Sequence, residues 1–71
     1  MNHRYEIDVF WSEEDQAFLA EVPDLPGCMA HGSTHEEALG EAQVAIAGWL
    51  EVLRESGEPV PEPRPRGLRL A

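Results

Sequence analysis

Apolar and polar residues alternate along the first segment of the chain, residues 4–11. One side of this segment carries the apolar residues Tyr5, Ile7, Val9 and Trp11, and the other carries Arg4, Glu6 and Asp8. A period of two with β-branched and aromatic residues predicts a strand with one buried face. A polar, acidic connection over residues 12–16 leads to a second strand-like run, residues 17–22. We therefore expect the two strands to form an antiparallel hairpin.

The next segment, Pro23-Asp24-Leu25-Pro26-Gly27, has the composition of a chain reversal. Proline cannot donate to a β-ladder and glycine tolerates positive φ, so the strand must end and the chain must turn here. Residues 28–31 are again strand-like, and Gly32-Ser33-Thr34 is a second break. We interpret the turn residues Pro23, Asp24, Pro26 and Gly27 as structural, since they shape the bend without constituting a binding site.

A single long helix is predicted from about His35 to Ser56. Thr34 and Glu37 have the spacing of a capping box, and Gly57 suits the left-handed residue that ends a helix. At 100° per residue, one arc collects apolar residues that we expect to be buried: Ala38, Leu39, Ala42, Ala45, Ile46, Trp49, Leu50 and Leu53. The far side of the helix carries four acidic residues, Glu37, Glu41, Glu51 and Glu55.

Together these elements predict one α+β domain over residues 1–58, in which a three-stranded antiparallel sheet is packed by one long helix (β-β-β-α). Residues 59–71 form a proline- and arginine-rich tail, because alternating prolines exclude both a helix and a central strand. Residues 67–71 leave two alternatives open, a short last strand or a frayed end.

The chain has 71 residues, which is little for an independent core. A core of this size supplies about 3–5 kcal/mol, and the single cysteine excludes a disulfide within the chain, so we expect a homo-oligomer, a dimer or a tetramer. Gly40 and Gly48 project outside the apolar arc; they are either tolerated in a long helix or leave room for the backbone of a partner subunit. The lone cysteine, with no apolar leader or membrane-spanning run, leads us to expect a cytoplasmic protein.

Charge is distributed unevenly along the chain. All 14 acidic residues lie within residues 1–63, where Arg4 and Arg54 are the basic residues, so this segment has a net charge of −12. Such a body repels nucleic-acid phosphates and attracts a basic protein. The simpler explanation is that acidic charge keeps a small domain soluble, and composition alone does not decide between the two.

Two groups of residues have types that can carry chemistry, and neither has a convincing arrangement. Cys28 and His31, with His35 as a third ligand, have metal-binding residue types, but alternation places Cys28 and His31 on opposite strand faces. Asp8 projects away from the helix glutamates, which argues against a two-metal nuclease site. The chain has no lysine and no glycine-rich phosphate loop. We expect no catalytic residue, no metal and no cofactor.

The turn, the helix start and the proline-rich exit together resemble one family. Residues 20–28 read Ala-Glu-Val-Pro-Asp-Leu-Pro-Gly-Cys, residues 31–39 read His-Gly-Ser-Thr-His-Glu-Glu-Ala-Leu, and residues 59–63 read Pro-Val-Pro-Glu-Pro. This pattern is similar to the HicB-like antitoxins, and the likeness runs from about Tyr5 to Pro63. The turn motif and the helix start at this separation make the resemblance specific.

The resemblance implies a reduced ribonuclease-H-like fold that lacks the nuclease carboxylates. It further implies a protein that neutralises a small basic toxin, an mRNA-cleaving enzyme, by hiding the toxin's catalytic histidine. Members of the family commonly form dimers or larger assemblies, and many carry a C-terminal helix-turn-helix or ribbon-helix-helix segment that binds DNA. Because this chain ends where that segment would begin, we do not expect it to bind DNA directly.

The first hypothesis is therefore a non-enzymatic antitoxin that occludes a small basic toxin. We expect the contacts on the helix glutamates, Glu37, Glu41, Glu51 and Glu55, while Thr34 and Glu37 also cap the helix. Two alternatives stay open: an orphan oligomeric scaffold or small-ligand binder without a toxin, and a residual metal-dependent nuclease.

Overall fold

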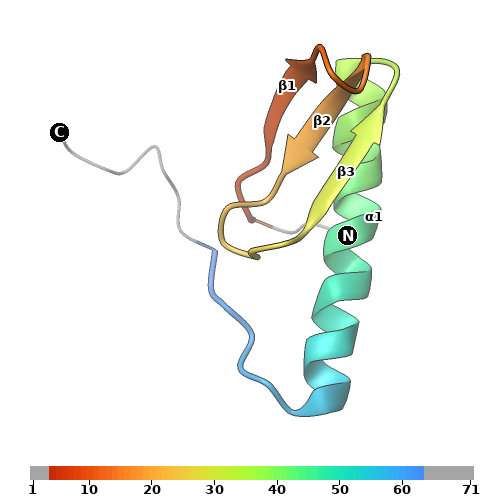
Figure 1. Cartoon of the computed structure of the whole chain (residues 1–71). Coiled ribbons are helices and arrows are strands. Elements are labelled where there is room, and N and C mark those ends of the chain that lie inside the picture. Colours follow the sequence, from red (N-terminus) through yellow and green to blue (C-terminus); the bar gives the residue numbers. More distant parts are fainter. Residues whose placement is uncertain (1–3, 64–71) are drawn as a thin grey trace, which may run out of the picture.

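The structure, a computed structural model, describes residues 4–63. It contains β1 (Asp8–Ser12), β2 (Ala17–Glu21), β3 (Met29–Gly32) and α1 (His35–Ser56). The strands form one antiparallel sheet in the order β1-β2-β3, and α1 lies along one face of it (Figure 1). The predicted α+β fold is confirmed. The likeness to ribonuclease H stays a prediction, and the suggested last strand, residues 67–71, lies outside the described residues.

The strand register determines which side chains share a face of the sheet. Val9 pairs with Ala20, and Ala20 pairs with Ala30; this row of side chains faces α1. Phe10 pairs with Leu19 on the opposite face, since successive side chains in a strand point to opposite sides. The first strand begins later than the predicted residue 4. Its partner β2 ends at Glu21, opposite Asp8, and the chain turns soon afterwards, so the ladder does not reach the earlier residues.

The helix occupies the predicted range because both of its ends are capped locally. The hydroxyl of Thr34 accepts a hydrogen bond from the backbone N–H of Glu37 over 3.0 Å. The Glu37 carboxylate in return accepts one from the backbone N–H of Ser33, one residue earlier than an ordinary capping box. At the other end Gly57 has φ of 74°, and its N–H bonds to the carbonyl of Arg54. Left-handed backbone of this kind favours glycine.

The sequence indicated only a break between strand and helix at Gly32. In the structure, this position also has no room for a side chain. A Cβ atom built at Gly32 would lie 2.5 Å from the backbone nitrogen of Ala38 and 2.9 Å from the Cβ of Glu37. No side chain fits at such distances without a shift of the backbone. The end of β3 and the first turn of α1 can therefore approach each other closely only with glycine at this position.

The core lies between the sheet and α1 and consists of two clusters. The larger one contains Tyr5, Val22, Leu25, Cys28, Ile46 and Leu50. The smaller one contains Ala20, Ala38 and Ala42. The expected burial was wrong for Leu39 (39% exposed) and Trp49 (36% exposed) of the helix arc, and for Trp11 of the first strand (44% exposed). A three-stranded sheet covers only a narrow stripe of the helix, and α1 packs mainly on β3.

The turn between β2 and β3 closes one end of the core. Leu25 is fully buried within it, and the backbone N–H of Leu25 bonds to the carbonyl of Val22 over 3.0 Å. Gly27 has φ of 94°, and the ring of Trp49 packs against it. In Figure 1, α1 continues past this turn, and residues 58–63 return toward the start of β1. The Tyr5 hydroxyl donates a hydrogen bond to the carbonyl of Pro61, which ties this returning segment to the body.

Candidate protein-binding site

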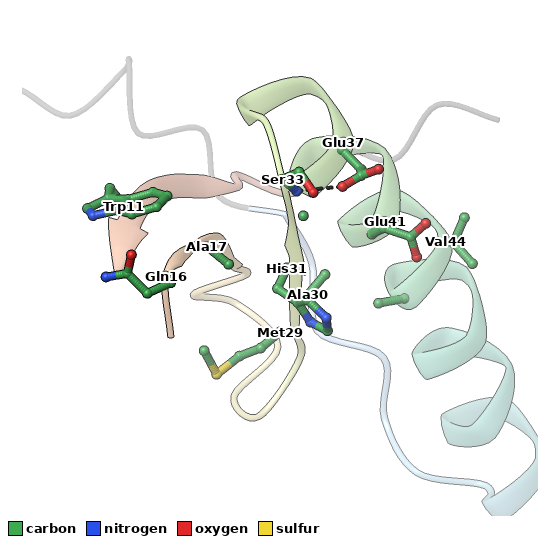
Figure 2. A pocket seen from close by; sticks show the side chains of 12 residues that line it. Trp11, Gln16, Ala17, Met29, Ala30, His31, Ser33, Glu37, Glu41 and Val44 are labelled. Atoms are coloured by element: carbon green, nitrogen blue, oxygen red, sulfur yellow. Dashed lines mark hydrogen bonds between the residues drawn. The ribbon is translucent and has the colours of Figure 1, made fainter. Parts of the chain in front are cut away.

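A groove of about 710 Å³ lies between β3 and the N-terminal half of α1. Met29 and His31 contribute from β3, and Glu37, Glu41 and Val44 contribute from α1 (Figure 2). The groove therefore combines two carboxylates with apolar side chains on a solvent-open surface. Trp11, Gln16 and Ala17 also line the groove. Since β3 leads directly into α1, the close approach at Gly32 fixes how these two elements sit against each other.

The two glutamates that line this groove have different local roles. The Glu37 carboxylate accepts the hydrogen bond from the Ser33 backbone, drawn as a dashed line in Figure 2, and so belongs partly to the helix cap. Glu41 is exposed and follows one turn later on the same side of the helix. Glu41 is thus the better placed of the two to interact with a partner without weakening the helix start.

The other two glutamates of the predicted contact set lie apart from this groove. Glu51 and Glu55 are exposed on the same side of α1. Glu51 follows Glu41 by ten residues, which is about 15 Å along the helix axis at 1.5 Å per residue. The structure therefore brings Glu37 and Glu41 together with β3 and places Glu51 and Glu55 beyond the groove.

Sequence reasoning described the outer side of α1 as acidic and passed over its exposed valines. Val44 and Val52 are both largely exposed. At 100° per residue Val44 falls between Glu41 and Glu51, inside the acidic side of the helix. Val44 lines the groove, whereas a single exposed apolar residue such as Val52 is normal on a protein surface.

The residues that were weighed as metal ligands do not converge. Cys28 is buried in the larger core cluster, where burial raises the pKa of its thiol. His31 is exposed, and the ring of His35 lies 4.1 Å from that of Phe18, centroid to centroid. Asp8 alternates with Val9 and so lies on the sheet face away from α1. Within residues 4–63, no three His, Cys, Asp or Glu side chains come together as ligands for a metal ion.

The larger core cluster contains a second buried titratable group, Tyr5, besides Cys28. Tyr5 is 8% exposed, and burial raises the pKa of its hydroxyl above the usual value of 10.0. The carboxylates of Asp24 and Glu62 raise this pKa further, while Arg54 opposes them. Tyr5 therefore stays neutral and holds its hydrogen bond to Pro61 over the ordinary pH range. Its role is to attach the returning segment.

The fold and the groove describe a small α+β protein with an acidic, open surface. No helix within residues 4–63 is long and apolar enough to cross a membrane. The chain belongs to the HicB-like antitoxins of bacterial toxin–antitoxin systems, because the sequence pattern of that family matches residues 5–68. The predicted resemblance is confirmed, and membership in this family implies a toxin as the partner and points to a regulatory role.

Three curated relatives are similar to the chain. The UPF0150 protein Ta0767 of Thermoplasma acidophilum is 36% identical over 53 residues, which cover 75% of this chain and 77% of that protein. The UPF0150 protein ssl0259 of Synechocystis sp. is 41% identical over 44 residues, 62% of this chain and 60% of its own length. An uncharacterized 14.9 kDa protein from the rep-hol intergenic region of Haemophilus phage HP1 is 35% identical over 51 residues, 72% of this chain and 38% of its own length. No solved structure matches the chain significantly.

Proposed function

We propose that this protein is an antitoxin that binds a small, basic, mRNA-cleaving toxin and neutralises it by covering its active site. The observation that carries the proposal is the family match over residues 5–68, which makes a toxin the expected partner. The basic character of that toxin is inferred from charge. Residues 4–63 carry 14 acids against Arg4 and Arg54, a net charge of −12, and a toxin that binds mRNA needs basic residues for the phosphates.

Opposite charge would act mainly on recognition and on the rate of association. A surface of one sign attracts a partner of the other sign, and this attraction weakens as salt screens it. We therefore place the first electrostatic contacts on the exposed helix glutamates, with Glu41 at the groove and with Glu51 and Glu55 further along α1. Glu37 contributes charge at the groove while it caps the helix.

The protein acts in this proposal without catalysis, since occlusion needs only a surface that fits the toxin. It works in the cytoplasm, where the mRNA substrate of the toxin is found, and as a homo-oligomer, which adds buried surface to a small core. Direct DNA binding is not part of the proposal, because the acidic body repels phosphates. An orphan scaffold without a toxin is the alternative that the following experiment separates.

The test is calorimetric titration with the product of the gene beside this one, if that gene encodes a small basic protein. We expect stoichiometric binding at low salt that weakens as salt is raised. In stopped-flow mixing, Glu41→Gln combined with Glu51→Gln and Glu55→Gln should slow association several-fold. Glu14→Gln in the β1–β2 connection is the matched control, since it removes an exposed acid away from α1. A neighbouring basic protein that shows no binding at low salt would refute the antitoxin role and favour the orphan scaffold.

A further inference from the structure

The face of the sheet that points away from α1 carries apolar side chains in the open. Phe10 is 40% exposed and Met29 is 49% exposed, with Leu19 half-buried between their strands. Phe10 pairs across β1 and β2 with Leu19. On β3, Met29 lies opposite Glu21 and lines one depression together with Leu19. We call this surface, formed by Phe10, Leu19 and Met29, the open face. Contiguous exposed apolar side chains in a small protein are typical of an interaction site.

The open face is hollowed, and its hollow continues into the groove beside α1. A depression of about 420 Å³ on the open face is lined by Leu19, Met29, His31 and three neighbours. Met29 and His31 also line the groove that contains Glu37 and Glu41. One continuous surface therefore passes around β3, from apolar side chains on the open face to carboxylates on the helix. A partner that contacts Glu41 is within reach of Met29 and Leu19 as well.

Charge around the open face selects between two kinds of occupant. Asp8 and Glu21 lie opposite each other in the strand register and both belong to this face. Asp15 lines its depression. A second copy of the chain docked face to face would place these acids against its own, so a homo-oligomer would form through another surface. Like charges that face each other oppose association, whereas a basic partner gains from the same arrangement.

We infer that the open face, with Phe10, Leu19 and Met29 at its centre, is the apolar anchor on which the basic toxin docks. This inference rests on the proposed antitoxin function and names the surface used for it. The toxin surface that fits has an apolar centre surrounded by Lys and Arg. The stems of these residues cover Phe10 and Met29, and their charged heads reach the surrounding acids. An apolar centre with a polar rim is the usual anatomy of a protein interface, and the centre holds most of the affinity.

The open face and the helix glutamates should affect different rate constants of toxin binding. Exposed charges mainly change the association rate and its salt dependence, whereas a buried apolar centre changes the dissociation rate. The helix glutamates and the open face should therefore separate in a kinetic measurement. Loss of the glutamates slows association, and loss of the open face speeds dissociation.

The test compares the full chain with its variant F10T/M29T in binding to the basic neighbouring protein. Threonine keeps a good strand former at both exposed positions while removing the apolar surface. We expect the dissociation constant to rise about tenfold or more, mostly through faster dissociation. Val52→Thr is the matched control, because it makes the same kind of change at an exposed position of α1 outside both grooves. This control should stay within about twofold of the unmodified chain.

A second measurement needs no variant, so it holds even if F10T/M29T does not fold. Exposed methionine is oxidised by peroxide to the sulfoxide, which mass spectrometry detects on the peptide that contains Met29. Bound toxin should slow this oxidation several-fold. Equal oxidation of Met29 with and without bound toxin would overturn the inference.

The remaining outcomes separate the inference from the function on which it rests. If the unmodified chain does not bind the basic protein, the antitoxin function fails and the docking surface falls with it. If the unmodified chain and F10T/M29T bind equally, the function stands and the inference is wrong. If F10T/M29T lowers the mass of the free protein in light scattering, a second copy occupies the open face, and this also overturns the inference.

Discussion

The two faces of the sheet are built from the same three strands and carry similar apolar side chains, yet only one face is covered by the helix. On the covered face, Val9 and Phe18 pack with Ala20 against α1. On the open face, Phe10 and Met29 remain exposed. A hydrophobic side chain in a small sheet therefore stabilises the fold only where another layer covers it. Where no layer covers it within the described chain, it is available to a partner.

The sequence contains a mark of this second face. Strict alternation would place a polar residue between Val9 and Trp11 and another after Phe18, but Phe10 and Leu19 occupy these positions. Runs of apolar residues in place of alternation indicate a strand that is buried on both faces. Changes on the covered face should therefore alter stability, and changes on the open face should alter binding. The following variants test this separation, from the largest expected effect on stability to the smallest.

Leu25→Ala should be the most damaging of these variants, since Leu25 is fully buried in the larger core cluster. Truncation of a buried leucine leaves a cavity and costs about 2–5 kcal/mol of unfolding free energy. Urea titration followed by circular dichroism measures this loss. Val52→Ala, at an exposed position of α1, is the control and should change stability by less than about 0.5 kcal/mol. A similar cost for the two variants would contradict the assignment of the core.

Gly32→Ala should destabilise the protein by about 1–3 kcal/mol, because the added methyl group has no room beside the first turn of α1. The same substitution at Gly40 should have the opposite sign. A Cβ at Gly40 meets no atom within 4 Å, and alanine favours a helix by about 1 kcal/mol over glycine. Thermal unfolding of both variants compares the two signs directly. If both alanine variants were stabilised equally, β3 and α1 would not approach each other closely at Gly32.

Tyr5→Phe should cost about 0.5–1.5 kcal/mol through the lost hydrogen bond to Pro61. It should also change the response to alkali. The pKa of Tyr5 is raised in the folded chain above its usual 10.0, so its contribution is complete below pH 10.0 and is lost as pH rises through the folded pKa. The unmodified chain should therefore lose more stability than Tyr5→Phe above that pH.

Cys28 must be kept in both chains for this comparison. Burial raises the pKa of its thiol above the usual 9.0, so the thiol acts in the same direction as Tyr5. Unfolding by urea at a series of pH values measures the difference. An identical alkaline slope for the unmodified chain and Tyr5→Phe would contradict the assigned role of the Tyr5 hydroxyl.

Met29→Thr should have the smallest effect on stability, within about 0.5 kcal/mol, because the side chain is 49% exposed and threonine suits a strand. Thermal unfolding of this variant sharpens the comparison between the two faces. A loss as large as that of Leu25→Ala would mean that the open face belongs to the fold.

Much of the fold could be predicted from the sequence because its signals are local. The bounds of α1 follow from the cap at Thr34 and from Gly57, and each of these acts within one helical turn. The exposure of Leu39 and Trp49 could not be predicted, since it depends on how little of the helix a three-stranded sheet covers. The need for glycine at Gly32 likewise comes from the distance between β3 and α1, which no local pattern encodes.

The candidate site was predictable only in part. Helical projection placed Glu37 and Glu41 on the polar side of α1, and the structure adds Met29 and His31 from β3 as the other wall of the groove. That juxtaposition depends on the packing of α1 against β3 and not on the sequence of either element. The open face was missed because alternation was taken as strict, although Phe10 departs from it.

The most direct test of the central claim is a calorimetric titration, at low and at high salt, of this protein with the product of the neighbouring gene, where that gene encodes a small basic protein. We expect saturable binding at low salt, weaker binding at high salt, and inhibition of the RNA-cleaving activity of the basic protein at the same stoichiometry. A well-folded basic neighbour that binds no antitoxin at low salt, or that cleaves RNA equally well in its presence, would contradict the account.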